Sequence, residues 1–393
     1  MGFTALFPEF NKVIALSFTF RLVRRLKDIN AEQWNRLAGD HPLVRHEFLL
    51  ALDETGCAVA GTGWAPHYLL LYRGDALQGA MPLYLKSHSR GEYVFDYAWA
   101  QAFERHGLPY YPKLLSAIPF TPVPGPRLLA ATHADRVLLA RKAIAITEEN
   151  GVSSLHVLFP SCEDQEALKE AGFLFRENVQ FHWFNQEYRD LDDFLSTLSQ
   201  QKRKKIRQDR KKAVQANVTF RWLEGPAIDD DTLNFFYRCY YQTYMEHGNA
   251  PYLSLAFFAR LRQTMAANMV LVLAEQDGTP VACALNMRSQ TTLFGRYWGS
   301  VRFVPGLHFE TCYMQAIEFC IAHGLKVFEG GAQGEHKLSR GMLPVQTCSA
   351  HWICDQRYAQ AITDFLAQET PAVTAYFNEL QEHSPFKKNP RRD

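Results

Sequence analysis

Alternating apolar residues mark two segments that lie far apart in the chain. "HYLLLYRGDALQGAMPLYL" (67–85) and "MVLVLAEQDGTPVACALNM" (269–287) each place apolar residues at every second position on both sides of a Gly-Asp or Asp-Gly pair. This dipeptide between alternating runs is typical of a tight β-turn. The pattern predicts two antiparallel hairpins of similar sequence.

A second pattern also occurs twice, later in each half of the chain. "KAIAITEENGVSSLHVLF" (142–159) matches "QAIEFCIAHGLKVFE" (315–329), with Gly151 and Gly324 at the point where helical periodicity stops. Glycine commonly ends a helix because it adopts the left-handed conformation without a Cβ clash. Each segment therefore predicts a helix that leads into a strand.

A late strand completes the repeat, since "QFHWFN" (180–185) resembles "SAHWIC" (349–354). The spacing between the halves shrinks after the hairpins, which indicates an extra segment in the first half around residues 90–126. Three recurrences in the same order favour two related units. Strands, helices and hairpins in this order predict an α/β fold with a mixed sheet in each unit.

The length of 393 residues also favours two domains, because one hydrophobic core seldom serves so long a chain. We expect the boundary where the first late strand ends. The predicted organisation is an N-terminal extension (1–20), a first domain (21–187), a second domain with a basic helix (188–385) and a C-terminal tail (386–393).

"RDLDDFLSTLSQQKRKKIRQDRKKAV" (189–214) predicts one amphipathic helix with Leu195, Leu198 and Ile206 on one side. Its middle carries eight Lys or Arg between residues 202 and 212. A solvated charged face is one reading of this stretch. The other is a site for a phosphate-rich partner such as RNA, a nucleotide or a pyrophosphate. The residues predicted for that site are Lys202, Arg203, Arg207 and Lys211.

The overall composition is that of an ordinary globular protein, with 47% hydrophobic and 21% charged residues and a net charge of +1. No global field attracts nucleic acid or membrane, so any such attraction must be local. The eight cysteines form no CxxC pair. They predict buried thiols in a reducing compartment and no metal site.

The chain start lacks the basic region and cleavage site of a signal peptide. No run approaches the roughly 18 apolar residues that a membrane helix needs. We therefore expect a cytoplasmic protein without a membrane span.

The segment "FEGGAQGEHKLSRG" (328–341) follows a predicted strand and gathers groups suited to acyl transfer. Transfer to an amine needs a base, oxyanion donors and cations for an anionic donor group. Glu335 or His336 is the candidate base, and Lys337 and Arg340 are candidate anion ligands. A surface ion-pair set on an ordinary turn is the alternative interpretation.

We expect neighbouring segments to line the same cleft. "GRYWG" should run beside the strand that ends at Glu329, and "LHFE" should begin the next helix. In the first half, the rigid proline-rich loop "PFTPVPGPR" (119–127) and the polar residues after the hairpin predict an acceptor pocket between the domains. The predicted substrate-binding residues are Arg296, Tyr297, Trp298, His308, Glu310, Glu329, Gly330, Gly331, Gln333, Lys86, His88, Glu92 and Asp96.

Several of these motifs, with "GEYVFDYAWA", "YYPKLL" and "LHFETCYMQAIE", resemble the FemAB-like family of the GNAT superfamily. The resemblance covers about residues 30–385 and implies two tandem GNAT-like domains. It also implies a role in peptidoglycan biosynthesis or recognition. Fem transferases move an amino acid from aminoacyl-tRNA onto a cell-wall precursor amine, and they carry basic helical elements early in the second domain.

One feature departs from the acetyltransferase pattern. The stretch "GRYWGSVRFVPGLHFE" (295–310) lacks the [RQ]-x-x-G-x-[GA] loop that binds the coenzyme A pyrophosphate, and Pro305 removes a backbone donor. Two functions stay open: an acyl- or aminoacyltransferase acting on an amine of a small molecule, peptide or cell-wall precursor, and a non-catalytic protein that recognises glycopeptide or RNA. The donor is either aminoacyl-tRNA or a coenzyme A thioester, and no cofactor is assigned.

Overall fold

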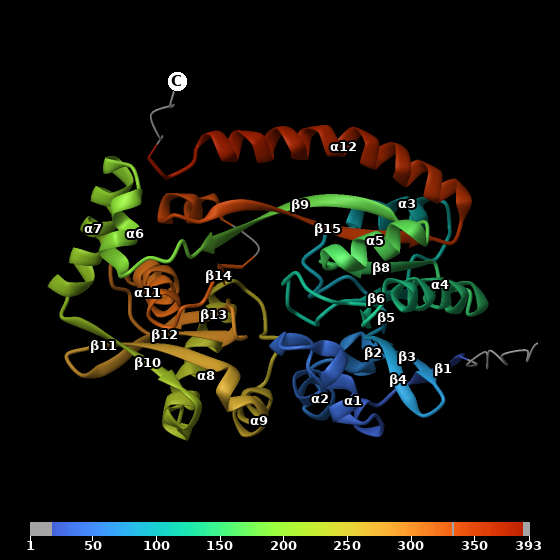
Figure 1. Cartoon of the computed structure of the whole chain (residues 1–393), viewed down its shortest axis with the longest axis horizontal. Coiled ribbons are helices and arrows are strands. Elements are labelled where there is room, and N and C mark those ends of the chain that lie inside the picture. The colour runs from blue at the N-terminus through green and yellow to red at the C-terminus, as the bar shows by residue number, and fades with distance from the viewer. Residues whose placement is uncertain (1–17, 332–333, 388–393) are drawn as a thin grey trace, which may run out of the picture.

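The computed structural model describes residues 18–331 and 334–387 and shows a mixed α/β protein (Figure 1). The first half of the chain lies on the right of Figure 1 and the second on the left, with α12 along the top of both. The first half contains β1 (Phe18–Val23), α1 (Ala31–Ala38), α2 (His46–Glu54), β2 (Trp64–Pro66), β3 (Tyr68–Arg73), β4 (Ala76–Met81), β5 (Tyr84–Lys86), α3 (Tyr97–Arg105), β6 (Lys113–Ser116), β7 (Leu129–Ala130), α4 (His133–Glu149), β8 (Ser154–Leu158), α5 (Cys162–Glu170) and β9 (Leu174–Phe184). The second half contains α6 (Leu191–Thr197), α7 (Gln200–Gln215), β10 (Val218–Glu224), α8 (Asp230–Glu246), α9 (Leu255–Met265), β11 (Met269–Gln276), β12 (Thr279–Arg288), β13 (Thr292–Ser300), α10 (Leu307–Phe309), the π-helical turn η6 (Glu310–Met314), α11 (Gln315–Ala322), β14 (Val327–Glu329), the 3-10 helix η7 (Glu335–Arg340), β15 (Leu343–Ile353) and α12 (Gln356–Glu382).

Two sheets organise these strands. A four-stranded sheet has the order β1-β3-β4-β7, and an eleven-stranded sheet has the order β10-β11-β12-β13-β14-β9-β15-β8-β6-β5-β2. The larger sheet therefore runs through both halves of the chain.

The two halves exchange their last strands within this sheet. β14 of the second half pairs with β9 of the first, with Glu329 opposite His182. β15 of the second half pairs with β8 of the first, with His351 opposite His156. The predicted boundary near residue 187 falls between β9 and α6, but the backbone pairing continues across it. Each half consequently depends on the other to complete its sheet.

The predicted hairpins are confirmed as β3–β4 and β11–β12. Asp277 and Gly278 turn between β11 and β12 with φ values of 50° and 75°, the left-handed region that Asp and Gly tolerate best. The helix–strand units are α4–β8 and α11–β14. Gly151 and Gly324 lie just beyond the two helices with φ of 61° and 66°, as the sequence predicted.

The extra segment of the first half (90–126) contains α3 and β6. β4 pairs with β7 in the small sheet, whereas β5 and β6 join the large one. The loop that follows β6 reaches the second half, where the Phe120 carbonyl accepts a hydrogen bond of 2.9 Å from Arg296 of β13. The Pro122 carbonyl accepts one of 2.9 Å from Gln180 of β9, in the first half. This loop therefore brings first-half residues to β13 of the second half.

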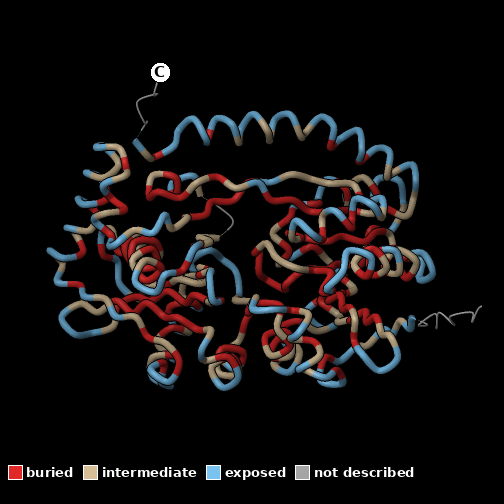
Figure 2. Tube along the Cα trace, in the orientation of Figure 1, coloured by how far each residue is buried: buried red, intermediate tan, exposed pale blue. Residues whose placement is uncertain are grey.

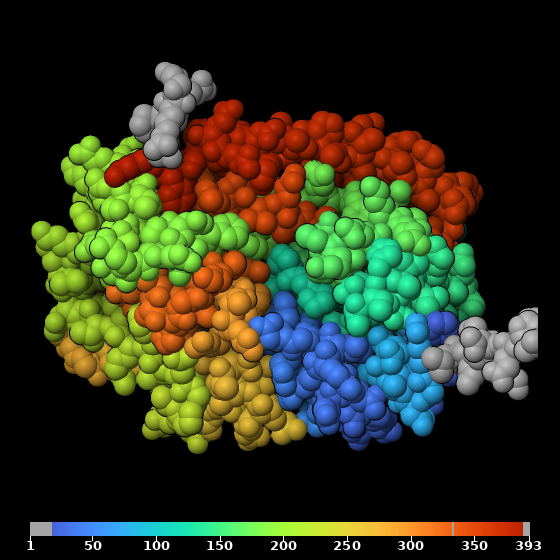
Figure 3. All heavy atoms as spheres, in the orientation of Figure 1, coloured from blue at the N-terminus to red at the C-terminus, as the bar shows by residue number. Residues whose placement is uncertain are grey.

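A shared hydrophobic core joins the halves. Phe48 of α2 meets Phe257 of α9 edge to face at 5.5 Å, and both rings are buried. Burial of one such side chain contributes about 1.5–3 kcal/mol to stability. Figure 2 shows buried strands in both halves and a largely exposed α12, and Figure 3 shows the two halves in contact along their length.

The single helix predicted over 189–214 is wrong, because the chain forms α6 and α7 instead. Leu198 is extended (φ −75°, ψ 155°) and forms an isolated bridge with Phe386. Leu198 is fully buried. Its apolar side chain thus packs in the core from the connection between the two helices, which helical periodicity alone did not reveal.

Candidate functional site

The candidate site begins where two parallel strands separate. Among the described residues, β13 and β14 pair only from Thr292 to Phe294 and from Val327 to Glu329. The strand that contains "GRYWG" therefore lies beside the strand ending at Glu329, as predicted, but the paired residues come before this motif. Beyond this point β13 continues beside β12, while the chain leaves β14 through Gly330 and Gly331. In the part of the chain that the structure describes, the rest of β13 has an edge without a strand partner on the β14 side.

A cavity of about 360 Å³ lies beside this open edge. We call it the edge cavity. Its walls come from α8, β12, β13, the helix after β13, the end of β14 and two first-half residues. The lining residues are Tyr93, Pro122, Tyr240, Thr243, Tyr244, Ala284, Leu285, Asn286, Gly295, Arg296, Tyr297, Trp298, His308, Cys312, Tyr313, Phe328, Gly330 and Gly331.

A β-bulge directs Arg296 within this wall. The β12–β13 register changes between Leu285 opposite Tyr297 and Asn286 opposite Gly295, so Arg296 is the extra residue. Bulges reorient a side chain and are frequent beside active sites. The sequence prediction that Arg296, Tyr297 and Trp298 line a cleft is consistent with this geometry.

The helix after β13 supplies the opposite wall. α10, η6 and α11 follow one another without a break, and η6 is a π-helical turn. His308, Cys312 and Tyr313 face the edge cavity. Burial lowers the pKa of His308 to about 4 and raises that of Cys312. At neutral pH the imidazole is therefore uncharged and the thiol remains protonated.

Glu310 does not join His308 on this wall, as the sequence analysis expected. Its carboxylate is buried, forms an ion pair with Arg210 at 3.1 Å and accepts a hydrogen bond from Gln315 at 2.9 Å. The helix turns this side chain toward α7, because residues two apart on a helix do not share a face.

The glycine-rich turn separates its predicted catalytic residues. Glu335 is exposed and accepts a 2.7 Å hydrogen bond from Tyr376 of α12. His336 is exposed, but its Nε2 lies 3.2 Å from the Tyr313 hydroxyl on the cavity wall. Burial and the nearby cations Lys337 and Arg340 lower the pKa of His336, which favours neutral imidazole. His336 therefore reaches the edge cavity through Tyr313, whereas Glu335 faces away from it.

The two cations of the turn are buried below it. Lys337 donates a 2.7 Å hydrogen bond to the Gly331 carbonyl, and burial lowers its pKa to about 8. Arg340 donates a 3.0 Å hydrogen bond to Asp209 and stacks 4.2 Å from the Phe309 ring. Both side chains thus support the cavity wall from behind. The predicted residue Gln333 lies outside the described residues.

Glu329 lies at the cavity's edge rather than on its wall. Within the described residues, one of its carboxylate oxygens is buried without a hydrogen-bond partner, as is Nε2 of His182 on the adjacent strand. Burial raises the pKa of Glu329 to about 8, against the opposing effect of Arg296 and Arg127. Its charge at neutral pH is therefore small.

The predicted first-half residues form a different structure. Lys113 donates hydrogen bonds to Glu92 at 2.8 Å and to Asp96, while Lys86 lies 3.8 Å from Glu92. These four side chains are buried, and none lines the edge cavity. His88 is half-buried beside them, where its Nδ1 accepts a hydrogen bond from Arg90. The set is a buried ion cluster, because the extra segment folds over it.

Sequence reasoning missed the aromatic part of the wall. Tyr240 and Tyr244 lie one turn apart on α8, and Tyr93 reaches the edge cavity from the first half. Burial raises the pKa of Tyr93, Tyr240 and Tyr244, so the phenols stay protonated. The repeated tyrosines in "FFYRCYYQTYME" (235–246) were the available signal, but a core-facing helix has the same pattern. The proline-rich loop does line the edge cavity, through Pro122.

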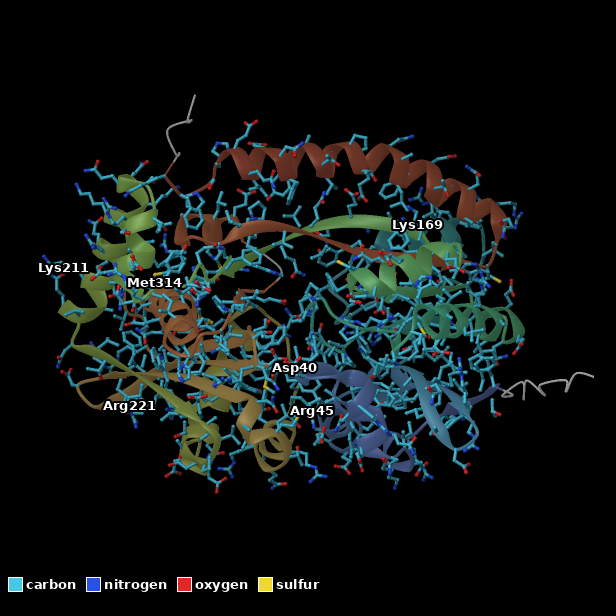
Figure 4. The ribbon with its side chains drawn as sticks, in the orientation of Figure 1. Asp40, Arg45, Lys169, Lys211, Arg221 and Met314 are labelled. Atoms are coloured by element: carbon cyan, nitrogen blue, oxygen red, sulfur yellow. The ribbon has the colours of Figure 1, made fainter. Side chains whose placement is uncertain are left out.

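The basic residues of α7 lie on the outer end of the second half (Figure 4). Lys202 lines a second cavity of about 620 Å³ with Lys205, Lys212 and Arg340. Arg207 pairs with Asp192 at 2.9 Å, and Arg203 donates to the Ser196 carbonyl at 3.3 Å. Lys211, labelled in Figure 4, is exposed. Within the part of the chain that the structure covers, no helix is both long and apolar enough to cross a bilayer.

Comparison with known proteins places these features in context. A family model described as FemAB-like, peptidoglycan biosynthesis/recognition, matches residues 25–388. No curated protein matches the chain in sequence.

Three solved structures resemble the fold. The C-terminal domain of a protein described as a lysylphosphatidylglycerol synthetase, from Agrobacterium fabrum, has a TM-score of 0.54 and 10% identity, covering 85% of this chain and 95% of its own. FemX has a TM-score of 0.54 and 12% identity, with 85% and 98% covered. L-PGS from Bacillus licheniformis has a TM-score of 0.50 and 10% identity, with 79% and 91% covered. The predicted mixed α/β fold is confirmed.

Proposed function

The chain belongs to the FemAB-like family of peptidoglycan biosynthesis/recognition proteins, and from this membership and the edge cavity we propose that it transfers an acyl or aminoacyl group onto an amine. The acceptor is an amine of a small molecule, a peptide or a cell-wall precursor. The proposal places the reaction in the second half of the chain.

The open edge of β13 is the observation that carries this proposal. From Gly295 onward no strand of the described residues pairs with β13 on the β14 side, and the edge cavity runs beside it. Unpaired N–H and C=O groups of an edge strand bind amide-containing ligands by adding a strand-like segment. A volume of about 360 Å³ fits the reacting end of an acyl donor together with a small acceptor.

The chemistry needs only groups already on the wall. The amine nitrogen attacks the carbonyl carbon of an ester or thioester donor, which forms a C–N bond and moves charge onto the carbonyl oxygen. Tyr313 remains protonated, because burial raises its pKa, and it donates a hydrogen bond to that oxygen. Neutral His308 accepts the proton of the ammonium formed on attack and returns it to the departing oxygen or sulfur.

Aminoacyl-tRNA is the donor that the surroundings favour. Gly306, at the start of the helix after β13, is packed against α7, since an added Cβ would lie 3.0 Å from the Asp209 carbonyl oxygen. The basic helix and the cavity-lining helix thus lie together, and a phosphate chain along α7 would end near His308. A coenzyme A thioester is the alternative donor, although Pro305 interrupts the backbone donors that its pyrophosphate would use.

The proposal is tested by incubating the full chain with charged tRNA or with acyl-coenzyme A and a panel of amines, with product detected by mass spectrometry. We expect transfer from one donor class, and a roughly 100-fold lower kcat for His308→Gln. His106→Gln is the matched control, because His106 is exposed at the end of α3. Ligand binding without transfer from any donor would instead identify a non-catalytic recognition protein.

A further inference from the structure

Arg296 is a cation on the wall of a largely aromatic cavity, and it has no acidic partner there. Among the described residues no carboxylate lies within 4.0 Å of its guanidinium. A half-buried cation without a counter-charge loses hydration that neutral hydrogen-bond acceptors replace only in part. Such a group is best satisfied by an anionic ligand.

The first half of the chain holds this guanidinium in place. One terminal nitrogen of Arg296 donates to the Phe120 carbonyl at 2.9 Å and to the Thr121 hydroxyl at 3.3 Å. Phe120 adopts a φ of 58°, and its ring stacks on Tyr252 at 4.7 Å. The backbone that presents this carbonyl is therefore conformationally strained and fixed by packing. The other guanidinium nitrogens have no hydrogen-bond acceptor among the described residues, and the guanidinium carbon lies 5.1 Å from the centre of the Tyr297 ring.

Other polar groups lie near Arg296 in the edge cavity. The Tyr297 hydroxyl is buried without a hydrogen-bond partner among the described residues, and Asn286 also lines the edge cavity. Glu329 is the nearby acid, but burial raises its pKa to about 8, so it leaves most of the charge of Arg296 uncompensated at neutral pH. A single guanidinium edge beside one hydroxyl matches a planar monoanion, because a phosphate dianion calls for more donors.

We propose that Arg296 binds a substrate carboxylate in the edge cavity, with Tyr297 as a second donor, and that the amine acceptor is therefore an amino acid or peptide rather than a simple amine. This inference rests on the proposed transferase function and adds the class of its substrate. The bulge in β13 and the first-half loop 119–127 together set this specificity.

The test compares each acid with its uncharged counterpart. Isothermal titration calorimetry with the full chain uses D-alanyl-D-alanine, L-alanyl-L-alanine and the C-terminal amide of each. We expect at least one acid to bind roughly 10- to 100-fold more tightly than its amide, the range of a hydrogen bond to a charged group. Arg296→Gln should abolish this difference, and Arg296→Lys should retain part of it.

Arg221→Gln is the control for loss of one positive charge, because Arg221 pairs with Glu275 on the exposed side of β10. Equal binding of acid and amide to the unaltered protein, or no binding of any acid at 10 mM, overturns the inference. Thermal melting of the Arg296 variants distinguishes lost recognition from lost folding.

The transfer assay separates this inference from the proposed function. Binding of acids that depends on Arg296, without transfer from any donor, leaves the carboxylate site standing and rejects the transferase. Transfer to acid and amide acceptors at equal rates rejects the carboxylate site and leaves the transferase standing.

Discussion

Arg340 donates a 3.0 Å hydrogen bond to Asp209, which ties the 3-10 helix after the glycine-rich turn to α7. Both residues are buried, with 5% and 8% of their surface exposed. Burial opposes ionisation of Asp209, but hydrogen bonds from Lys212 and Lys205 hold its pKa below the usual value. The contact therefore holds the 3-10 helix η7, which lies behind the cavity wall, against the basic helix α7.

Asp209→Asn should destabilise the protein by about 2 kcal/mol at pH 7, because it removes the carboxylate that a buried guanidinium requires. Urea unfolding followed by circular dichroism measures this change. Asp192→Asn is the matched control, since Asp192 pairs with Arg207 on the surface at 2.9 Å and such pairs contribute about 0.5 kcal/mol. An equal loss in both variants would show that burial of the Arg340 pair has no energetic consequence.

Tyr313→Phe should lower kcat about 10- to 100-fold and leave KM within about twofold, because the hydroxyl is needed only when charge develops on the carbonyl oxygen. Steady-state kinetics with the donor found in the transfer assay measures the effect. Tyr376→Phe removes a hydroxyl that contacts Glu335 on the outer surface, so its turnover should be unchanged. Similar losses in the two variants would argue against a role for Tyr313 in the reaction.

His41 links stability to pH at the junction of the halves. Its ring packs 5.0 Å from Phe294, and burial together with Arg127 lowers its pKa from 6.5 to about 4. The unfolded chain therefore binds a proton between pH 6.5 and 4 that the folded chain does not. Stability must fall as pH decreases through this window.

His41→Gln should reduce the loss of stability between pH 7.5 and pH 5 by about 2 kcal/mol relative to the unaltered protein, as follows from the shift in pKa. Urea unfolding at the two pH values measures the difference. His106→Gln, at an exposed site on α3, should leave the pH dependence unchanged. A His41→Gln protein with the unaltered pH dependence would refute the assignment of this proton.

Local periodicity made the hairpins and the helix–strand units predictable from sequence. The β11–β12 turn, for instance, needs residues that tolerate positive φ, and Asp277 and Gly278 provide them. The exchange of β14 and β15 between the halves was not predictable. The apolar pattern of a strand indicates that the strand is buried, but it does not indicate which strand lies beside it.

The candidate site was predicted only in part, for a similar reason. Arg296 and His308 reach the edge cavity as expected, because they follow one another around the open end of β13. The acid of the turn does not, because Glu335–Arg340 forms a 3-10 helix. Residues three apart share a face in such a helix, so Lys337 and Arg340 point inward together. Glu335, at the start of this helix, is exposed and accepts a hydrogen bond from Tyr376 of α12. When the conformation of a turn is unknown, its sequence does not indicate which side chains point inward.

The predicted phosphate-binding residues of α7 include a ridge on its outer side. Arg203, Arg207 and Lys211 recur every four residues of the helix and so lie along one line. Lys211 has no carboxylate within 4.0 Å among the described residues, and Arg207 pairs only with the exposed Asp192. A phosphate-rich partner could therefore bind these cations and break few contacts within the protein.

Changing Arg203, Arg207 and Lys211 together to Gln should weaken tRNA binding and should lower the slope of log affinity against log salt by about 2–3, since each phosphate contact releases about one counterion. Fluorescence anisotropy with labelled tRNA from 50 to 300 mM salt measures both quantities. The matched control changes Arg105, Arg141 and Lys169 to Gln, which removes the same charge from exposed first-half positions. If the two triple variants lose affinity equally, net charge rather than this ridge attracts RNA. If neither loses affinity, α7 is a solvated surface, and the acyl donor must be sought among coenzyme A thioesters.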